Sequence, residues 1–168
     1  MKNNITNNLL FFGTLLMVLF QYGCSNDINQ LVAKNGFICY INEKLYIPNA
    51  GTGKGGGKIP PITWSYNDTT KLCTIYTRGD YRIRISFNQP LIGKNIITDA
   101  LSDSFDTRHS GIIVKNETNF YTTKKHKNNG FLNFTKLTSN HLMGTFQCTL
   151  YNNNNELIKI NGQFDLQK

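Results

Sequence analysis

Apolar and polar residues alternate along much of this chain, with the period of two that is typical of half-buried β-strands. The clearest example covers residues 142–150, where Leu, Gly, Phe, Cys and Leu occupy the even positions and Met, Thr, Gln and Thr the odd ones. The same alternation runs through residues 81–87 and 158–166. Each segment is therefore predicted to be a strand with one face on a core and the other in water.

Shorter apolar runs predict further strands at residues 37–41, 44–47, 62–66, 72–77, 111–115, 120–123 and 131–137. The connections carry residues that favour tight turns, such as Asn42-Glu43, Arg78-Gly79-Asp80 and Asn152–Asn155. Residues 96–107 are the only stretch that suits even one short helical turn. About ten short strands joined by turns predict an all-β domain, an antiparallel β-sandwich or β-barrel of about eight to ten strands, over residues 36–168.

The first residues break the alternation. A polar start with Lys2 is followed by an apolar run of 12 residues, 9–20. That length lies within the roughly 7 to 15 residues of a signal-peptide core. As a helix it would rise about 18 Å, well short of a hydrocarbon layer of about 30 Å. Residues 1–23 are therefore predicted to be a cleaved signal peptide.

Residues 19–24, Leu-Phe-Gln-Tyr-Gly-Cys, resemble the lipobox of bacterial lipoproteins, with Gln21 at a position that is usually aliphatic. The resemblance implies that Cys24 becomes the lipid-carrying N-terminus. Acyl chains such as palmitate would then anchor the protein in a membrane. Residues 24–35 would form a tether, and Ser25 favours the outer membrane of the cell envelope over the inner one. Plain secretion and an uncleaved anchor are the alternatives.

The closing strands carry Gly144-Thr145-Phe146 and Asn161-Gly162-Gln163-Phe164, and an early strand carries Cys39-Tyr40-Ile41-Asn42-Glu43 followed by Tyr46. This combination resembles a group of Bacteroidota lipoproteins of unknown function, over residues 37–50 and 111–166. The resemblance implies an all-β domain with a lipid anchor and implies no activity. Glu43 stands where that group more often has glycine, so the first hairpin is expected to turn differently.

The chain is basic, with 18 Lys and Arg against 10 Asp and Glu, a net charge of +8. Loss of the signal peptide removes Lys2 and leaves +7. Such a charge suits acidic surfaces such as lipid phosphates or an anionic glycan, although general solubility is the preferred explanation. An anionic glycan or an envelope protein is the candidate partner. Because the protein is expected in the cell envelope, nucleic acid is not an expected partner. Once Cys24 carries lipid, three thiols allow one disulfide at most, and a free buried thiol is preferred for Cys148.

Three pairs of side chains are candidates for ligand binding. Trp64 and Tyr66 lie at period two and would make one strand face aromatic, either for a sugar or simply for the core. Lys54 and Lys58 lie in a glycine tract that matches G-x-G-x-x-G, but Ile59-Pro60-Pro61 follows instead of the helix that a phosphate loop needs. A flexible surface loop is the alternative there.

The third pair, Lys124 and Lys125, belongs to a basic cluster with His126 and Lys127 that would suit an acidic polymer or form a solvated hairpin tip. No residue pattern predicts a catalytic site, a metal site or a cofactor. Enzymatic action on glycans would require acids that converge in three dimensions, for instance Asp80 or Glu117 beside His126. The sequence therefore predicts a non-catalytic binding or structural β-domain, with an enzyme or a ligand-binding barrel acting on envelope or extracellular glycans as the alternative.

Overall fold

A computed structural model of the chain describes residues 36–52, 57–99 and 109–168. The predicted signal peptide, the tether, Cys24 and Lys54 lie outside the described residues. The described residues belong to one compact unit, and all of their regular structure is β, as predicted. Within them, no helix is long and apolar enough to cross a membrane.

Thirteen strands make up the described fold. They are β1 (Phe37–Ile41), β2 (Lys44–Tyr46), β3 (Gly51–Thr52), β4 (Lys58–Ile59), β5 (Ile62–Asn67), β6 (Leu72–Thr77), β7 (Arg82–Asn88), β8 (Gly93–Ile96), β9 (Gly111–Lys115), β10 (Phe120–Thr122), β11 (Gly130–Thr138), β12 (His141–Tyr151) and β13 (Leu157–Gln167). β3 and β4 form a small hairpin of their own, and the other eleven strands form one sheet in which every pairing is antiparallel.

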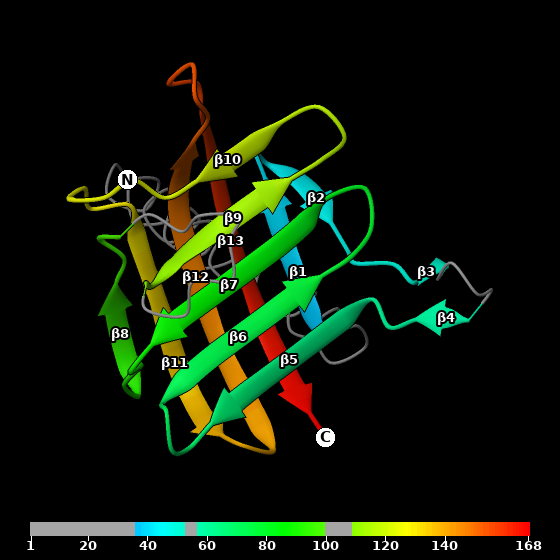
Figure 1. Ribbon diagram of the computed structural model, residues 1–168, viewed down its shortest axis with the longest axis vertical. Coiled ribbons are helices and arrows are strands. Elements are labelled where there is room, and N and C mark those ends of the chain that lie inside the picture. Colours follow the sequence, from blue (N-terminus) through cyan, green and yellow to red (C-terminus); the bar gives the residue numbers. More distant parts are fainter. Residues whose placement is uncertain (1–35, 53–56, 100–108) are drawn as a thin grey trace, which may run out of the picture. The chain divides into compact units, whose positions relative to one another are not determined.

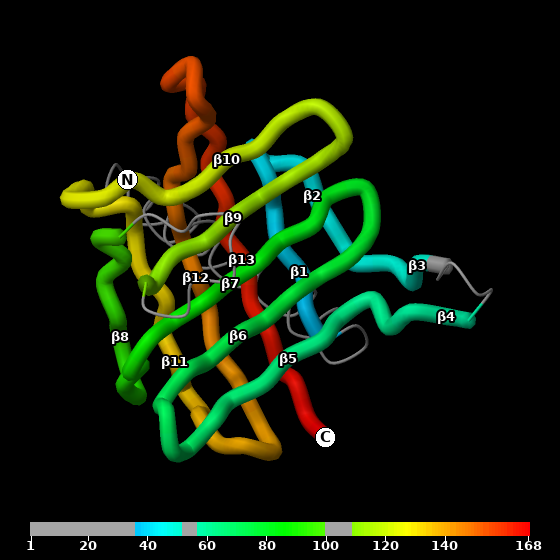
Figure 2. Tube along the Cα trace, in the orientation of Figure 1, coloured from blue at the N-terminus to red at the C-terminus, as the bar shows by residue number. Residues whose placement is uncertain are grey.

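The large sheet curls into two layers that share β12. The rear layer runs β2-β1-β13-β12-β11-β8, and the front layer runs β10-β9-β7-β6-β5. β12 joins them because one edge pairs with β11 as far as Cys148 and then with β10 at Tyr151. Figure 1 shows the front strands running obliquely across the rear ones, and Figure 2 shows the chain passing from β7 in front to β8 behind. The path ends at β5 and β2 without closing, so the fold is a half-barrel.

The core fills the space between the two layers with aliphatic side chains and phenylalanine rings. Phe87 of the front layer meets Phe134 of the rear layer edge to face, with ring centroids 6.5 Å apart. Phe134 in turn meets Phe164 at 5.9 Å. The inward positions of β12 and β13 are those that the alternation predicted.

Two glycines of the closing hairpin make room for two of these rings. Gly144 pairs with Phe164 and Phe146 pairs with Gly162, so each ring lies against the glycine of the opposite strand. A Cβ atom added at Gly144 would lie 2.9 Å from Cζ of Phe164, and one added at Gly162 would lie 2.7 Å from Cζ of Phe146. The Gly-Thr-Phe and Asn-Gly-x-Phe segments therefore form a reciprocal packing unit, in which an aromatic ring covers a glycine across the strands.

The ten predicted strands are present, and their limits shift by a residue or two. The sequence missed β3, β4 and β8. β3 and β4 are two residues each and flank the glycine tract, while β8 is four residues long and begins with Gly93, so none of them has room to show an alternating pattern. The possible helical turn at 96–107 is wrong at its start, because Ile96 ends β8; residues 100–108 lie outside the described part.

The predicted turns are confirmed. Asn42 and Glu43 have φ angles of 47° and 67°, which is the left-handed pair that a two-residue hairpin requires. Glycine is preferred at the second of these positions, yet the hairpin forms with Glu43 in place. Asn155 is left-handed in the last turn, with φ of 63°, and Gly79 has φ of 139° between β6 and β7.

The register of the rear layer defines its two ends. Phe37, where β1 begins, pairs with Phe164, and the row continues through Gly144 and Phe134 to Gly93, where β8 begins. We call this the Gly36 end, after the residue that precedes β1. The opposite row joins Ile41, Ile160, Cys148 and Gly130, and we call it the Gly130 end. In Figure 1 the Gly130 end is uppermost.

Candidate functional site

The connection between β10 and β11 carries the basic cluster and lies at the Gly130 end. We call residues 124–129 the basic loop. The hairpin-tip alternative is wrong, because β10 pairs with β9 and β12 while β11 pairs with β12 and β8, so the loop links two strands that do not pair with each other. Asn129 closes the loop and is only 2% exposed.

Asn129 organises the loop from inside. Its Oδ1 accepts a hydrogen bond from the backbone N–H of Lys124 at 2.8 Å. Its Nδ2 donates to the carbonyl oxygens of Lys124 at 2.7 Å, Lys127 at 3.0 Å and Ile97 at 3.2 Å. The backbone N–H of His126 adds a bond to the carbonyl of Thr98 at 2.8 Å. A buried amide that satisfies both sides of a loop fixes its conformation, because breaking these bonds would leave polar groups unpaired in the interior.

Two lysines of the basic loop converge on one aromatic ring. The Nζ atoms of Lys124 and Lys127 lie 4.8 Å and 5.2 Å from the ring centroid of Tyr151, at the end of β12. Lys124 also donates a hydrogen bond to Oδ1 of Asn155 in the next turn. Each cation–π contact is worth about 0.5–1 kcal/mol at an exposed site. Both ammonium groups thus lie at one ring, and each would attract an anion that approaches this part of the surface.

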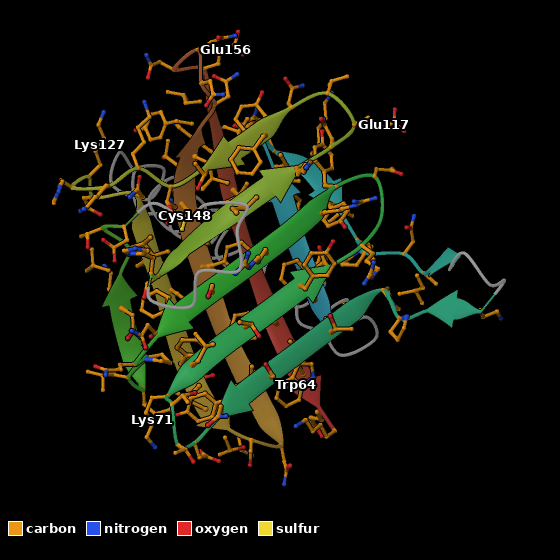
Figure 3. The ribbon with its side chains drawn as sticks, in the orientation of Figure 1. Trp64, Lys71, Glu117, Lys127, Cys148 and Glu156 are labelled. Atoms are coloured by element: carbon orange, nitrogen blue, oxygen red, sulfur yellow. The ribbon has the colours of Figure 1, made fainter. Side chains whose placement is uncertain are left out.

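Of the other candidates, Trp64 and Tyr66 face the core. Tyr66 is 8% exposed and belongs to the core cluster, and Trp64 packs against that cluster with Nζ of Lys168 5.1 Å from its ring centroid. Figure 3 shows Trp64 near the chain's C-terminus, far from Lys127. Lys58 is exposed on β4, and Lys125 is exposed on the basic loop. The structure therefore places Lys124 and Lys125 in one loop, and it places Lys58, Trp64 and Tyr66 on other elements, β4 and β5.

The thiols of Cys39, Cys73 and Cys148 are buried and free, which confirms the preference for Cys148. Burial disfavours the thiolate and raises the pKa of each thiol from 9.0 to about 12. A nucleophilic or metal-binding cysteine requires the thiolate. These three side chains are therefore core residues that behave as small apolar groups.

In the part of the chain that the structure describes, two histidines lie beside carboxylate groups. Nε2 of His141 lies 2.7 Å from Oδ1 of Asp165 on the outward face of β12 and β13, and His109 lies 3.9 Å from Asp99. Glu117 does not approach the basic loop, because Figure 3 places it at the β9–β10 turn, across the molecule from Lys127. Among the described residues, no group of three or more His, Cys, Asp or Glu side chains is arranged to hold a metal ion.

Asn129 and Tyr151 are the parts of this site that sequence reasoning missed. Asn129 is one of 23 asparagines, and nothing in its neighbours marks it as buried. Tyr151 stands at the end of an alternating strand, and its partnership with the lysines arises only when β10 pairs with the last residue of β12. Comparison of the chain with family models, with curated proteins and with solved structures found no match in any of the three.

Proposed function

We propose that this protein is a lipid-anchored protein of the bacterial cell envelope whose β-domain is a non-catalytic binding module for an anionic partner. Cys24 would carry the lipid, and residues 24–35 would link it to the domain. The basic loop would be the binding site, with an acidic glycan as the ligand class. The observation that carries the binding role is the convergence of Lys124 and Lys127 on Tyr151.

The construction of the loop supports a binding role over a merely solvated one. A mobile lysine-rich loop would lose conformational entropy when it closes on a ligand. Here the loop backbone is fixed beforehand by the hydrogen bonds of Asn129, so less entropy remains to be lost. Lys125 and His126 are exposed beside the lysine pair and extend the positive surface.

The chemistry of the loop favours carboxylate or sulfate groups on a sugar polymer. Lysine ammonium groups are point charges without the planar fork of arginine, which selects one phosphate geometry. They therefore suit a polymer whose anionic groups repeat along the chain and can bind in more than one register. Tyr151 is half-buried beside the two lysines, and aromatic rings are apolar surfaces of the kind that sugar rings contact. A net charge of +7 on the mature chain would draw such a polymer in from a distance at low salt.

Binding is tested with polygalacturonate, a uronate polymer, in a titration at low salt. The double variant Lys124→Gln/Lys127→Gln is compared with Lys58→Gln/Lys71→Gln, which removes the same charge from exposed positions elsewhere. We expect the loop variant to bind roughly tenfold more weakly, about 1.4 kcal/mol, and the control to change little. Equal losses in the two variants would show that only net charge matters, and would refute the site.

The anchor is tested separately by metabolic labelling with palmitate. The wild-type protein should incorporate the label, and Cys24→Ala should not. Label retained by the Cys24→Ala protein would refute lipid attachment at that residue. Because this test does not involve the basic loop, the two halves of the proposal stand or fall independently.

A further inference from the structure

Two adjacent aliphatic side chains stand out from the turn between β7 and β8. Leu91 is 72% exposed and Ile92 is 62% exposed, the two highest values among the large hydrophobic side chains that the structure describes. They are neighbours at the tip of one turn, whereas single exposed apolar residues elsewhere on a surface are ordinary.

The turn is held rigidly, so this exposure is not fraying. Oδ1 of Asn95 accepts a hydrogen bond from the backbone N–H of Leu91 at 2.8 Å. Nδ2 of Asn95 donates to the carbonyl oxygens of Leu91 and Gly93, both at 2.8 Å. Before the tip, Pro90 is buried, and the backbone N–H of Gln89 donates to the carbonyl of Lys71 at 2.7 Å. The fold thus presents the pair in a fixed position instead of hiding it.

The register places this turn at the Gly36 end. Gly93, which follows the pair, lies in the same row as Phe37, which follows Gly36. Four strand spacings separate β8 from β1, about 19 Å at about 4.8 Å each. The chain between Cys24 and Gly36 spans at most about 40 Å at about 3.3 Å per residue. A lipid on Cys24 is therefore attached to the end of the domain that carries Leu91 and Ile92.

The charges beside the turn suit the headgroups of anionic lipids. Lys94 is exposed next to Gly93, with its Nζ 4.5 Å from the ring centroid of Phe131. Lys71 is exposed on the neighbouring β5–β6 turn, together with Asp68, which offsets one of the two positive charges. Figure 3 shows Lys71 on the lower side of the molecule, away from Lys127. Aliphatic side chains flanked by lysines are the composition of interfacial membrane contacts.

We propose that the Leu91–Ile92 turn is a second membrane contact, which inserts into the interface of the bilayer that holds the lipid anchor. The inference rests on the proposed function, because it needs the anchor to bring this end to the bilayer. The domain would then stand on its Gly36 end, and the basic loop at the Gly130 end would face away from the membrane, toward a polymer outside it.

The test uses the mature lipidated protein in vesicles of phosphatidylcholine and phosphatidylglycerol with brominated acyl chains, which quench tryptophan on contact. Trp64, the only tryptophan, is first replaced by phenylalanine. Leu91→Trp then places the reporter at the turn, and Ile92→Trp gives a second one. The matched control is Leu157→Trp, because Leu157 is 52% exposed and starts β13 at the Gly130 end, opposite Tyr151.

We expect the tryptophan at position 91 or 92 to lose most of its emission and to shift to shorter wavelength, while the one at position 157 stays as bright as with unbrominated lipid. Flotation of the same samples reports the anchor. Protein that floats with the vesicles while both turn reporters stay unquenched overturns the membrane contact and leaves the anchor intact. Protein that does not float overturns both.

Discussion

The packing unit formed by Gly162 and Phe146 predicts a large effect from one added methyl group. In Gly162→Ala, the new Cβ would lie 2.5 Å from the carbonyl oxygen of Ile38, 2.6 Å from Cβ of Cys39 and 2.7 Å from Cζ of Phe146. All three distances are shorter than real Cβ contacts allow. Only the Phe146 ring is able to turn away, because the other two atoms belong to the backbone and first side-chain atom of β1.

The magnitude follows from two opposing terms. Overpacking of a filled core costs about 1–3 kcal/mol. Replacing a strand glycine with alanine also removes freedom from the unfolded chain, which stabilises by about 0.5–1 kcal/mol. We therefore expect Gly162→Ala to lose roughly 1–2 kcal/mol of unfolding free energy and to lower Tm by roughly 6 °C.

Urea unfolding followed by Trp64 fluorescence measures this change, with Gly51→Ala as the control, because a Cβ at Gly51 meets nothing within 4 Å. A double-mutant cycle that combines Gly162→Ala with Phe146→Leu measures how much of the loss comes from the clash with the Phe146 ring. If the clash with Cζ matters, Gly162→Ala should cost less in the leucine background, by about 0.5 kcal/mol or more. A Gly162→Ala protein as stable as the wild type, or a cycle with no coupling, would refute the reciprocal packing of glycine and ring.

Other predictions follow from the turn, the core thiols and the basic loop. Glu43→Gly should stabilise the protein by about 1 kcal/mol, because a left-handed non-glycine residue costs about that much, while Lys44→Gly in the adjoining strand should destabilise it in the same urea assay. The buried thiols stay neutral in the folded protein up to a pKa of about 12 but ionise near 9.0 when unfolded. The stability that these neutral thiols contribute is therefore fully present below pH 9 and is lost as pH rises toward 12, by up to about 1.4 kcal/mol per pH unit for each thiol. Cys73→Val should reduce this loss of unfolding free energy per pH unit. A pH dependence identical to that of the wild type would contradict the burial of the Cys73 thiol. Asn129→Ala should cost about 2–3 kcal/mol, because it leaves buried groups unpaired, and should weaken polygalacturonate binding with the lysines still present; unchanged binding would show that the loop does not need its internal support.

The long strands were predictable because each has one buried face and one solvent-exposed face. β12 shows this most clearly, since its burial alternates at almost every residue. β8 was not predictable, because its four residues begin with Gly93 and its exposed aliphatic side chain, Ile96, reverses the expected burial. A short edge strand is defined by the strand it pairs with, here β11, and that information is not local.

The residues of the candidate site also fall into two groups, those that the sequence marks and those that only the fold reveals. The sequence marks the lysines of the basic loop, because charge is visible residue by residue. It does not mark Asn129 as their support or Tyr151 as their shared ring, because both roles depend on where β12 meets β10. For Trp64 and Tyr66 the period-two spacing predicts an aromatic face, either for a sugar or for the core, and the fold turns that face to the core.

The residues that carry the resemblance to lipoproteins of unknown function are mostly occupied in holding the fold together. Gly144, Phe146, Gly162 and Phe164 pack against one another in pairs across β12 and β13. Tyr46 donates its hydroxyl to the carbonyl of Arg78 at 3.0 Å and so ties β2 to the front layer. In this chain these residues therefore serve the packing of the fold. Exposed side chains on a fixed backbone lie elsewhere, at residues 125–128 of the basic loop and on the Leu91–Ile92 turn. Substitutions of these exposed side chains should change binding while leaving stability nearly intact, whereas substitutions in the glycine–phenylalanine pairs, or of the buried Asn129, should lower stability.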